Sequence, residues 1–322
     1  MPYNNVISRT DAAALIPAEV SAEILKNVPQ ASATMRLARR LPNLSRNTRS
    51  MPVMSALATA YFLTGDNSLK QTTEVNWESK NITAEELAVI VPIPEAVLDD
   101  SEYDIWSEVR PQLEEAFGRA IDAAVLYGTN IPASWSTNMG AAGLVAVMTA
   151  ASHVISAAAY SDLYEAILGE TAAGADGLCM LLEADGFMPT AHLGHTSFRG
   201  KLRNVRDSNG NPIFQPSMQN RGQYTLDGAP IEFPTNGAIS ATYWDIVGQW
   251  DQLVYAMRQD ITYKVLDQAV IQDAAGNIIY NLAQQDMVAL RAVMRLGFAL
   301  PNPINRMNET AATRCAFAAL TA

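Results

Sequence analysis

A regular stripe of apolar side chains between residues 99 and 128 constrains the fold more than any other feature. Its members recur every fourth residue, at Ile105, Val109, Leu113, Phe117, Ile121 and Val125. This spacing predicts an amphipathic helix with one buried face. The run Asp-Asp-Ser at 99–101 supplies capping oxygens, and Gly128 is a suitable end. About 26 residues would give a rod of roughly 39 Å, although Pro111 predicts a kink or a start near Arg110.

A long hairpin is predicted before this helix. Residues 46–82 contain two extended limbs, separated by a cluster of turn residues from Thr64 to Ser68. The ascending limb, SALATAYFL from Ser55 to Leu63, has no charged residue. If the hairpin protrudes, this limb needs a partner, because a lone two-stranded ribbon has exposed edges and little core. The pattern alone leaves open whether the hairpin protrudes or belongs to a compact sheet.

The rest of the chain mixes short helices and strands. Apolar residues alternate from Leu87 to Ile93, which is typical of a strand. Ser161 and Asp162 precede a short helical pattern. Further strands are predicted at residues 179–182, 253–261 and 287–300. We therefore expect an α+β fold in which elements from the middle and the end of the chain share a sheet.

Charge is scarce and unevenly distributed. Only 17% of the residues are charged and 49% are hydrophobic, whereas about 25% charged is usual. Such a composition favours assembly with identical copies. The first 50 residues hold seven bases and three acids, and the remainder has a net charge of −15. A nucleic-acid-binding body is disfavoured. The basic residues of the first segment could contact a neighbour's acidic surface or nucleic acid, and the neighbour is favoured; they are Arg36, Arg39, Arg40, Arg46 and Arg49.

No group of residues indicates catalysis. The three histidines, His153, His192 and His195, are scattered, and HExxH and CxxC patterns are absent. We expect His192 and His195 to be surface residues in a loop. Nucleotide-binding glycine motifs and the GxSxG motif are also absent. The carboxylate pairs at 85–86, 99–100 and 114–115 are interpreted as solvated faces or helix caps, so no catalytic, cofactor or metal site is predicted.

Compartment and membrane signals are weak. Two cysteines, Cys179 and Cys315, are too few for a disulfide framework, which makes a reducing cytoplasm the default. The opening residues do not resemble a secretory signal. The most apolar stretch, Ala141–Tyr160, includes a histidine and many alanines, so we expect no membrane span.

The body of the chain contains one basic cluster. Its members are Arg199, Lys201, Arg203 and Arg206, with Phe198 as the only interleaved aromatic residue. A solvated turn or an ion-pair site between subunits is favoured over phosphate binding.

Several segments, in order, resemble the major capsid protein of tailed bacteriophages with the Hong Kong 97 shell fold. They are VPIPEAVLDDS (91–101), IDAAVLYGTN (121–130), KLRNVRDSNGNPIF (201–214), LDGAPIEF (226–233) and ALRAVMRLGFALPNP (289–303). Each string alone is weak, but their joint order across nearly the whole chain is specific.

The resemblance implies a division of the chain into four parts. These are an N-terminal arm at 1–44, an extended β-hairpin called the E-loop at 45–82, a peripheral domain with a long spine helix at 83–128 and 251–322, and an axial domain at 129–250. It also implies contacts between subunits through the arm and the hairpin. The expected contact residues are Arg36, Arg39, Arg40, Arg46, Arg49, Tyr61, Phe62, Leu63 and Lys70.

The implied function is a non-enzymatic shell subunit. Identical copies would assemble through hexamers and pentamers into an icosahedral virion capsid, in the host bacterial cytoplasm, around double-stranded DNA that is not read by sequence. Portal and scaffolding proteins are the other expected partners. Because the arm begins almost at Met1, we expect a separate scaffolding protein or none. An encapsulin-like compartment and a cytoplasmic α/β enzyme are the alternatives.

Some relatives cross-link a hairpin lysine to an asparagine of another subunit with the help of a glutamate. Here Lys70 lies near the hairpin turn, and residues of the required types occur near the end of the chain, namely Asn302, Asn305, Asn308 and Glu309. A lysine at a hairpin tip is most simply a solubilising edge charge. We therefore expect no self-cross-linking.

Overall fold

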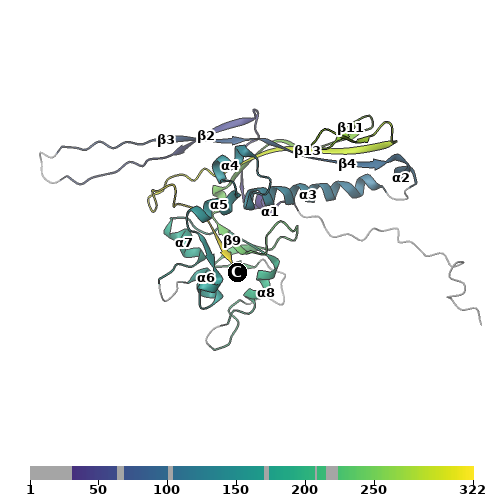
Figure 1. The fold of residues 1–322 in the computed structure, drawn as a ribbon. Coiled ribbons are helices and arrows are strands. Elements are labelled where there is room, and N and C mark those ends of the chain that lie inside the picture. Colours follow the sequence, from purple (N-terminus) through teal and green to yellow (C-terminus); the bar gives the residue numbers. More distant parts are fainter. Residues whose placement is uncertain (1–30, 64–68, 101–103, 170–173, 207–208, 215–223) are drawn as a thin grey trace, which may run out of the picture.

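The computed structural model describes residues 31–63, 69–100, 104–169, 174–206, 209–214 and 224–322. These residues form an elongated layer with a lobe beneath it (Figure 1). The long layer consists of a four-stranded sheet and helix α3 (Ile105–Tyr127), and the lobe is built on a six-stranded sheet. The helix expected between Pro17 and Val28 lies outside the described residues.

The four-stranded sheet has the order β1-β10-β13-β4. Its strands are β1 (Arg39–Arg40), β4 (Glu85–Pro94), β10 (Val254–Leu266) and β13 (Met287–Ala299). β13 lies antiparallel between β10 and β4, and the short hairpin of β11 (Val270–Gln272) and β12 (Ile278–Asn281) connects β10 to β13. The strands predicted at 87–93, 253–261 and 287–300 are confirmed. β1 pairs with β10, so the end of the expected arm is part of the folded body.

Helix α3 packs along the sheet through the predicted stripe. Leu113 and Phe117 are buried and share a cluster with Leu290 and Ala292 of β13. Burial of such side chains contributes about 1.5–3 kcal/mol each. The helix ends at Gly128, whose φ of +70° and contact with the loop at 141–142 leave no room for a side chain.

The start of α3 differs from the prediction. Asp104 is the N-cap, and its carboxylate accepts hydrogen bonds from the backbone N–H groups of Trp106 and Ser107. Asp99 and Asp100 instead end a separate short helix, α2 (Glu95–Asp100). The helix runs through Pro111, so a start near Arg110 is wrong.

The predicted hairpin protrudes. β2 (Thr48–Met54) pairs with β3 (Trp77–Thr83) in a separate two-stranded sheet, and the limbs continue beyond it, away from the body (Figure 1). The residues of the predicted turn, 64–68, lie outside the described residues. Because β2 and β3 form a sheet of their own, the alternative of a hairpin enclosed in a compact sheet is wrong.

The lobe has a six-stranded sheet in the order β5-β14-β9-β6-β8-β7. Its strands are β5 (Val154–Ser156), β6 (Ala191–Gly194), β7 (Thr225–Leu226), β8 (Ala229–Glu232), β9 (Tyr243–Gly248) and β14 (Phe317–Thr321). As predicted, an element from the chain end shares a sheet with elements from the middle. The sheet also shows that residues 251–322 are not one unit, because β14 lies between β5 and β9 in the lobe.

The remaining helices of the described chain are short and lie in both the long layer and the lobe. They are α1 (Ala33–Leu37), α4 (Ala133–Met139), α5 (Gly143–Ala150), α6 (Leu163–Leu168), α7 (Leu178–Ala184) and α8 (Thr196–Leu202), with 3₁₀ turns η1 (Ala157–Ala159) and η2 (Trp250–Gln252). Asp162 caps α6 as predicted. The strand predicted at 179–182 is wrong, because it belongs to α7; a short apolar run fits a buried helix equally well.

The histidine prediction also needs correction. His192 is completely buried in β6, not exposed in a loop. His195 caps α8, where its Nδ1 accepts a hydrogen bond from the backbone N–H of Ser197. None of the described helices is both long and apolar enough to cross a membrane. The stretch Ala141–Tyr160 is divided among α5, β5 and η1.

Candidate assembly surfaces

The protruding hairpin exposes large apolar side chains. Phe62 is fully exposed, Leu69 is 90% exposed and Trp77 is 66% exposed, and Tyr61 and Leu63 are exposed as well. Lys70 is also exposed. We call the segments 55–63 and 69–77 the hairpin surface. Several large exposed apolar side chains on one protruding element indicate an interaction site in a soluble protein.

The hairpin surface has little support from its own subunit. The regular ladder ends at the Met54–Trp77 pair. Beyond it, Asn76 O accepts hydrogen bonds from Ser55 N at 2.8 Å and from Ala56 N at 3.3 Å, and Thr59 N donates to Thr73 Oγ1 at 2.9 Å. A lone ribbon of this kind is only marginally stable in water. A neighbouring surface would therefore supply most of its burial.

Three arginines of the arm contact groups of their own subunit. Arg36 makes an ion pair with Glu232 of the same chain. Both guanidinium NH₂ groups of Arg49 donate to backbone carbonyls at 42–43, and Arg40 donates to Asn43. These contacts orient the three side chains within the subunit. Arg39 and Arg46 are exposed, and neither has an ion pair with a described residue.

A buried carboxylate fixes the point where the arm meets the body. Asp122 of α3 is completely buried and accepts five hydrogen bonds. The donors are Ser32 Oγ and Thr34 Oγ1 at 2.6 Å, Ala33 N and Thr34 N at 3.0 Å, and Asn236 Nδ2 at 2.8 Å. Several donors can stabilise a buried carboxylate without a counter-ion. Sequence reasoning missed this site, although an aspartate among the apolar positions 121–126 was a signal.

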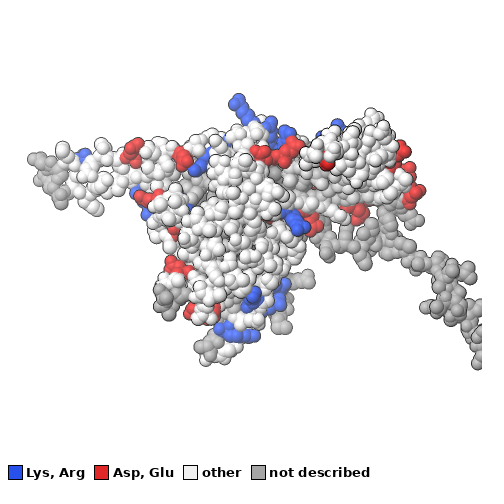
Figure 2. All heavy atoms as spheres, in the orientation of Figure 1, with Lys and Arg blue, Asp and Glu red and all other residues white. Residues whose placement is uncertain are grey.

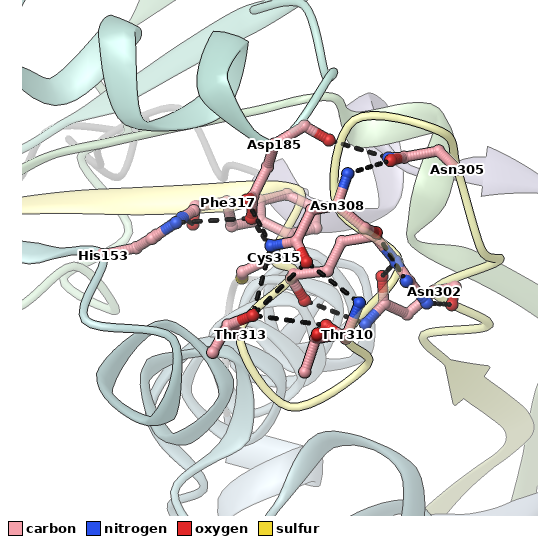
Figure 3. A network of polar contacts seen from close by, with 10 residues as sticks. His153, Asp185, Asn302, Asn305, Asn308, Thr310, Thr313, Cys315 and Phe317 are labelled. Carbon is pink, nitrogen blue, oxygen red and sulfur yellow. Dashed lines mark hydrogen bonds and ion pairs between the residues drawn. The ribbon is translucent and has the colours of Figure 1, made fainter.

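A second polar network joins the lobe to the chain that leaves β13. We call residues 301–316 the strap, because they connect β13 of the long layer to β14 of the lobe. Asp185, next to α7, accepts hydrogen bonds of 2.7 Å from Asn308 Nδ2, Cys315 N and, through its carbonyl, Asn305 Nδ2 (Figure 3). His153 Nε2 lies 3.4 Å from the same carboxylate.

Arg314 completes this network from within the strap. It is 3% exposed and donates to the side chain and backbone oxygens of Asn302 and to Asn308 O. Asn302 returns a hydrogen bond to Arg314 O. The side-chain amides of Asn302, Asn305 and Asn308 are thus all engaged inside the subunit.

The strap also contacts the hairpin. Ile304 N donates to Met54 O at 3.3 Å, and the Arg306 guanidinium donates to Ala58 O. The base of the hairpin is therefore linked, through the strap and Asp185, to the six-stranded sheet.

Buried titratable groups in the lobe are structural. His192 Nδ1 and Asp245 Oδ2 are 2.7 Å apart on neighbouring strands, and both side chains are completely buried. Burial, with a smaller contribution from Asp245, raises the pKa of the Cys179 thiol to about 12. A thiol with so high a pKa is a poor nucleophile at neutral pH. No metal-binding group of histidine, cysteine and carboxylate side chains occurs among the residues that the structure describes.

Sequence comparison links this architecture to viral shells. The model of the phage capsid family matches residues 12–305. The major capsid protein of Staphylococcus phage 80alpha is 26% identical over 283 residues, which cover 86% of this chain and 79% of that protein.

Solved structures agree over nearly the full length. A structure from Microbacterium phage Oxtober96 is 32% identical with a TM-score of 0.81, covering 98% of this chain and 99% of that one. A structure from Mycobacterium phage Adephagia is 28% identical, also with a TM-score of 0.81, and covers 98% of both chains. The capsid of a native GTA particle, computed with C5 symmetry, shares the fold at 16% identity and a TM-score of 0.62, covering 99% of both chains.

The fold thus defines a viral shell protein. The chain belongs to the phage capsid family. It is a major capsid protein of a tailed phage, a non-enzymatic structural subunit of the icosahedral virion shell. The predicted resemblance is confirmed, and the encapsulin-like and enzyme alternatives are not supported.

Proposed function

We propose that copies of this chain form hexamers and pentamers and that the protruding hairpin is the E-loop of the shell. The exposed apolar hairpin surface is the observation that supports this proposal, because it becomes buried only against another molecule. The C5 symmetry of the related GTA particle is consistent with pentamers.

The other regions take corresponding roles in this proposal. Helix α3 is the spine helix of the peripheral domain, together with the four-stranded sheet, and the lobe is the axial domain. β14 belongs to the axial domain, so the peripheral domain ends before it. The exposed Arg39 and Arg46 contact an adjacent subunit. A portal protein and a scaffolding protein are the other proposed partners, and double-stranded DNA is enclosed without sequence-specific contacts.

Expression of the chain followed by electron microscopy tests this proposal. We expect shells or capsomers for the wild-type chain and folded, unassembled subunits for the variant Phe62→Ser/Leu69→Ser. Met188→Ser is the matched control, because Met188 is 66% exposed but lies on the lobe. A wild-type chain that remains monomeric under all assembly conditions would contradict the proposal.

A further inference from the structure

Charged residues gather in two separate places on the lobe. Figure 2 shows Lys and Arg over the side that carries α8, and Asp and Glu over the side that carries α6 and α7. The basic patch consists of Lys201, Arg203 and Arg206, all exposed. The acidic patch consists of Asp162, Glu165 and Asp176, which are exposed or half-exposed. The two patches therefore carry opposite charge on one lobe.

Both patches lie at the same end of the six-stranded sheet. β6 ends at Gly194, opposite Asp245 near the start of β9, and α8 follows at once. β5 ends at Ser156, opposite Thr321 of β14, and leads through η1 into α6. Thr321 pairs with Tyr243 at the start of β9, so the end of β5 and the end of β6 lie at the same end of the sheet. A rotation about an axis at this end of the lobe can bring one patch toward the other on an adjacent copy.

The basic patch has no acidic partner within the described chain. Lys201 Nζ lies 3.8 Å from the centroid of the Trp244 ring, which holds the ammonium group at the surface. None of its three side chains forms an ion pair with a described residue. A groove of about 460 Å³ is lined by Lys201 and Arg206 and also by Asp162, and no ion pair joins these described residues. The charges are thus kept apart within one copy.

The acidic patch is held in a fixed arrangement. Asp162 Oδ1 accepts a hydrogen bond from Glu165 N at 2.9 Å, and Glu165 Oε2 accepts one from Ser161 Oγ at 2.5 Å. Asp162 thus caps the first turn of α6, and the Glu165 carboxylate is held by Ser161, the residue before the cap. Tyr160, two residues before Asp162, donates to the backbone carbonyl of Asp176 at 2.5 Å and so ties the backbone at Asp176 to the segment that precedes α6. Preorganised carboxylates lose little entropy when they bind cations.

We propose that the basic patch of one copy pairs with the acidic patch of the next copy around each ring of subunits. This inference rests on the proposed function and identifies the contact that closes its hexamers and pentamers. A contact between two different patches is heterologous, and such contacts form closed rings when the rotation closes. Like charges at the same contact would oppose assembly strongly. The occupant of the basic patch is therefore a second copy of this chain.

Charge reversal tests the pairing. We expect Arg203→Glu/Arg206→Glu to reduce the yield of assembled particles at least ~10-fold at physiological salt. Lys264→Glu/Arg291→Glu is the matched control, because it makes the same change in net charge on exposed, paired positions of β10 and β13. Thermal unfolding of both variants checks that each is folded.

Rescue by a complementary change gives the decisive result. Glu165→Lys/Asp176→Lys should also fail to assemble, and a chain with both double changes should recover most of the wild-type yield, because the charges are then exchanged. No recovery in a folded four-fold variant would overturn the inference, as would normal assembly of Arg203→Glu/Arg206→Glu.

Two further outcomes distinguish pairing between subunits from nucleic-acid binding, and failure of this inference from failure of the proposed function. If Arg203→Glu/Arg206→Glu lowers only the retention of a labelled DNA duplex by the subunit, with assembly unchanged, the patch binds nucleic acid and the inference is wrong. If those variants assemble normally while Phe62→Ser/Leu69→Ser does not, this inference fails and the proposed function stands. A wild-type chain that never assembles overturns both.

Discussion

Ser32 Oγ donates a 2.6 Å hydrogen bond to Asp122 Oδ1, so the residue that precedes α1 is bound to the last third of the long helix α3. The carboxylate also binds three donors from Ala33 and Thr34 and one from Asn236 of the lobe. One buried side chain thus joins the first described residues, the long layer and the lobe.

Replacing Asp122 should destabilise the subunit. Asp122→Ala leaves buried donors unpaired, and we expect a loss of about 4 kcal/mol in the free energy of unfolding. Urea unfolding in the unassembled Phe62→Ser/Leu69→Ser background measures it. Glu115→Ala, on a half-exposed position of the same helix, should change stability by less than ~0.5 kcal/mol. Equal effects of the two substitutions would show that the hydrogen bonds to Asp122 contribute little.

The stability of the lobe should fall in mild acid because of His153. Burial lowers the pKa of His153, and its hydrogen bond to Phe317 O and the charge of Asp185 offset this only in part. The unfolded chain therefore binds the proton more readily than the folded one, so stability is greatest above pH ~6.5 and decreases as the pH falls from there toward the lower folded pKa.

Melting temperatures at pH 7.5 and 5.5 check this prediction in the same unassembled background. His153→Gln should show a smaller decrease than the parent chain. His195→Gln is the control, since His195 is half-exposed at the start of α8. A decrease that is unchanged in His153→Gln would mean that other groups cause the acid sensitivity.

The mature shell should not be cross-linked through the strap. The amides of Asn302, Asn305 and Asn308 all donate hydrogen bonds inside the subunit, two of them to Asp185. An amide held this way is not presented to Lys70 of another copy. Boiled particles should therefore run as monomers on a denaturing gel. A ladder of covalent oligomers that disappears in Lys70→Arg would refute this expectation.

The two cysteines should resist alkylation in the folded subunit. Burial raises the pKa of both the Cys179 and the Cys315 thiols to about 12. Thiolate is the reactive form, so iodoacetamide should react at least ~100-fold more slowly at pH 8 than in urea. Mass spectrometry of the intact chain measures the rate. Fast labelling without denaturant would indicate an opening of the lobe that the structure does not show.

Periodic segments could be predicted from sequence, and buried polar groups could not. The apolar stripe from Leu113 to Val125 determines which face of α3 is buried. Apolar residues that recur every fourth position lie on one face of a helix and on no single face of a strand. The segment at 179–182 is short and apolar on all sides, so its sequence does not distinguish α7 from a strand. Asp99 and Asp104 are both suitable cap residues, and the structure places Asp104 at the N-cap of α3 and Asp99 in α2.

For the assembly surfaces too, some features could be predicted from the sequence and others could not. Absence of charge from Ser55 to Leu63 indicated that this limb would need a partner if the hairpin protruded, and the structure exposes Tyr61, Phe62 and Leu63 there. The role of Asp185 could not be predicted, because its partners lie more than 100 residues away in the strap. Arg36 and Arg49 were expected to meet a neighbour, but contacts within the subunit already engage them.

The most direct test of the central claim is a high-resolution electron cryomicroscopy map of the assembled shell. The claim is that the hairpin surface becomes buried only on an adjacent copy. The map should therefore show Phe62 and Leu69 covered by a neighbouring subunit. A map in which the hairpin folds back on its own subunit, or leaves both side chains in solvent, would contradict the claim.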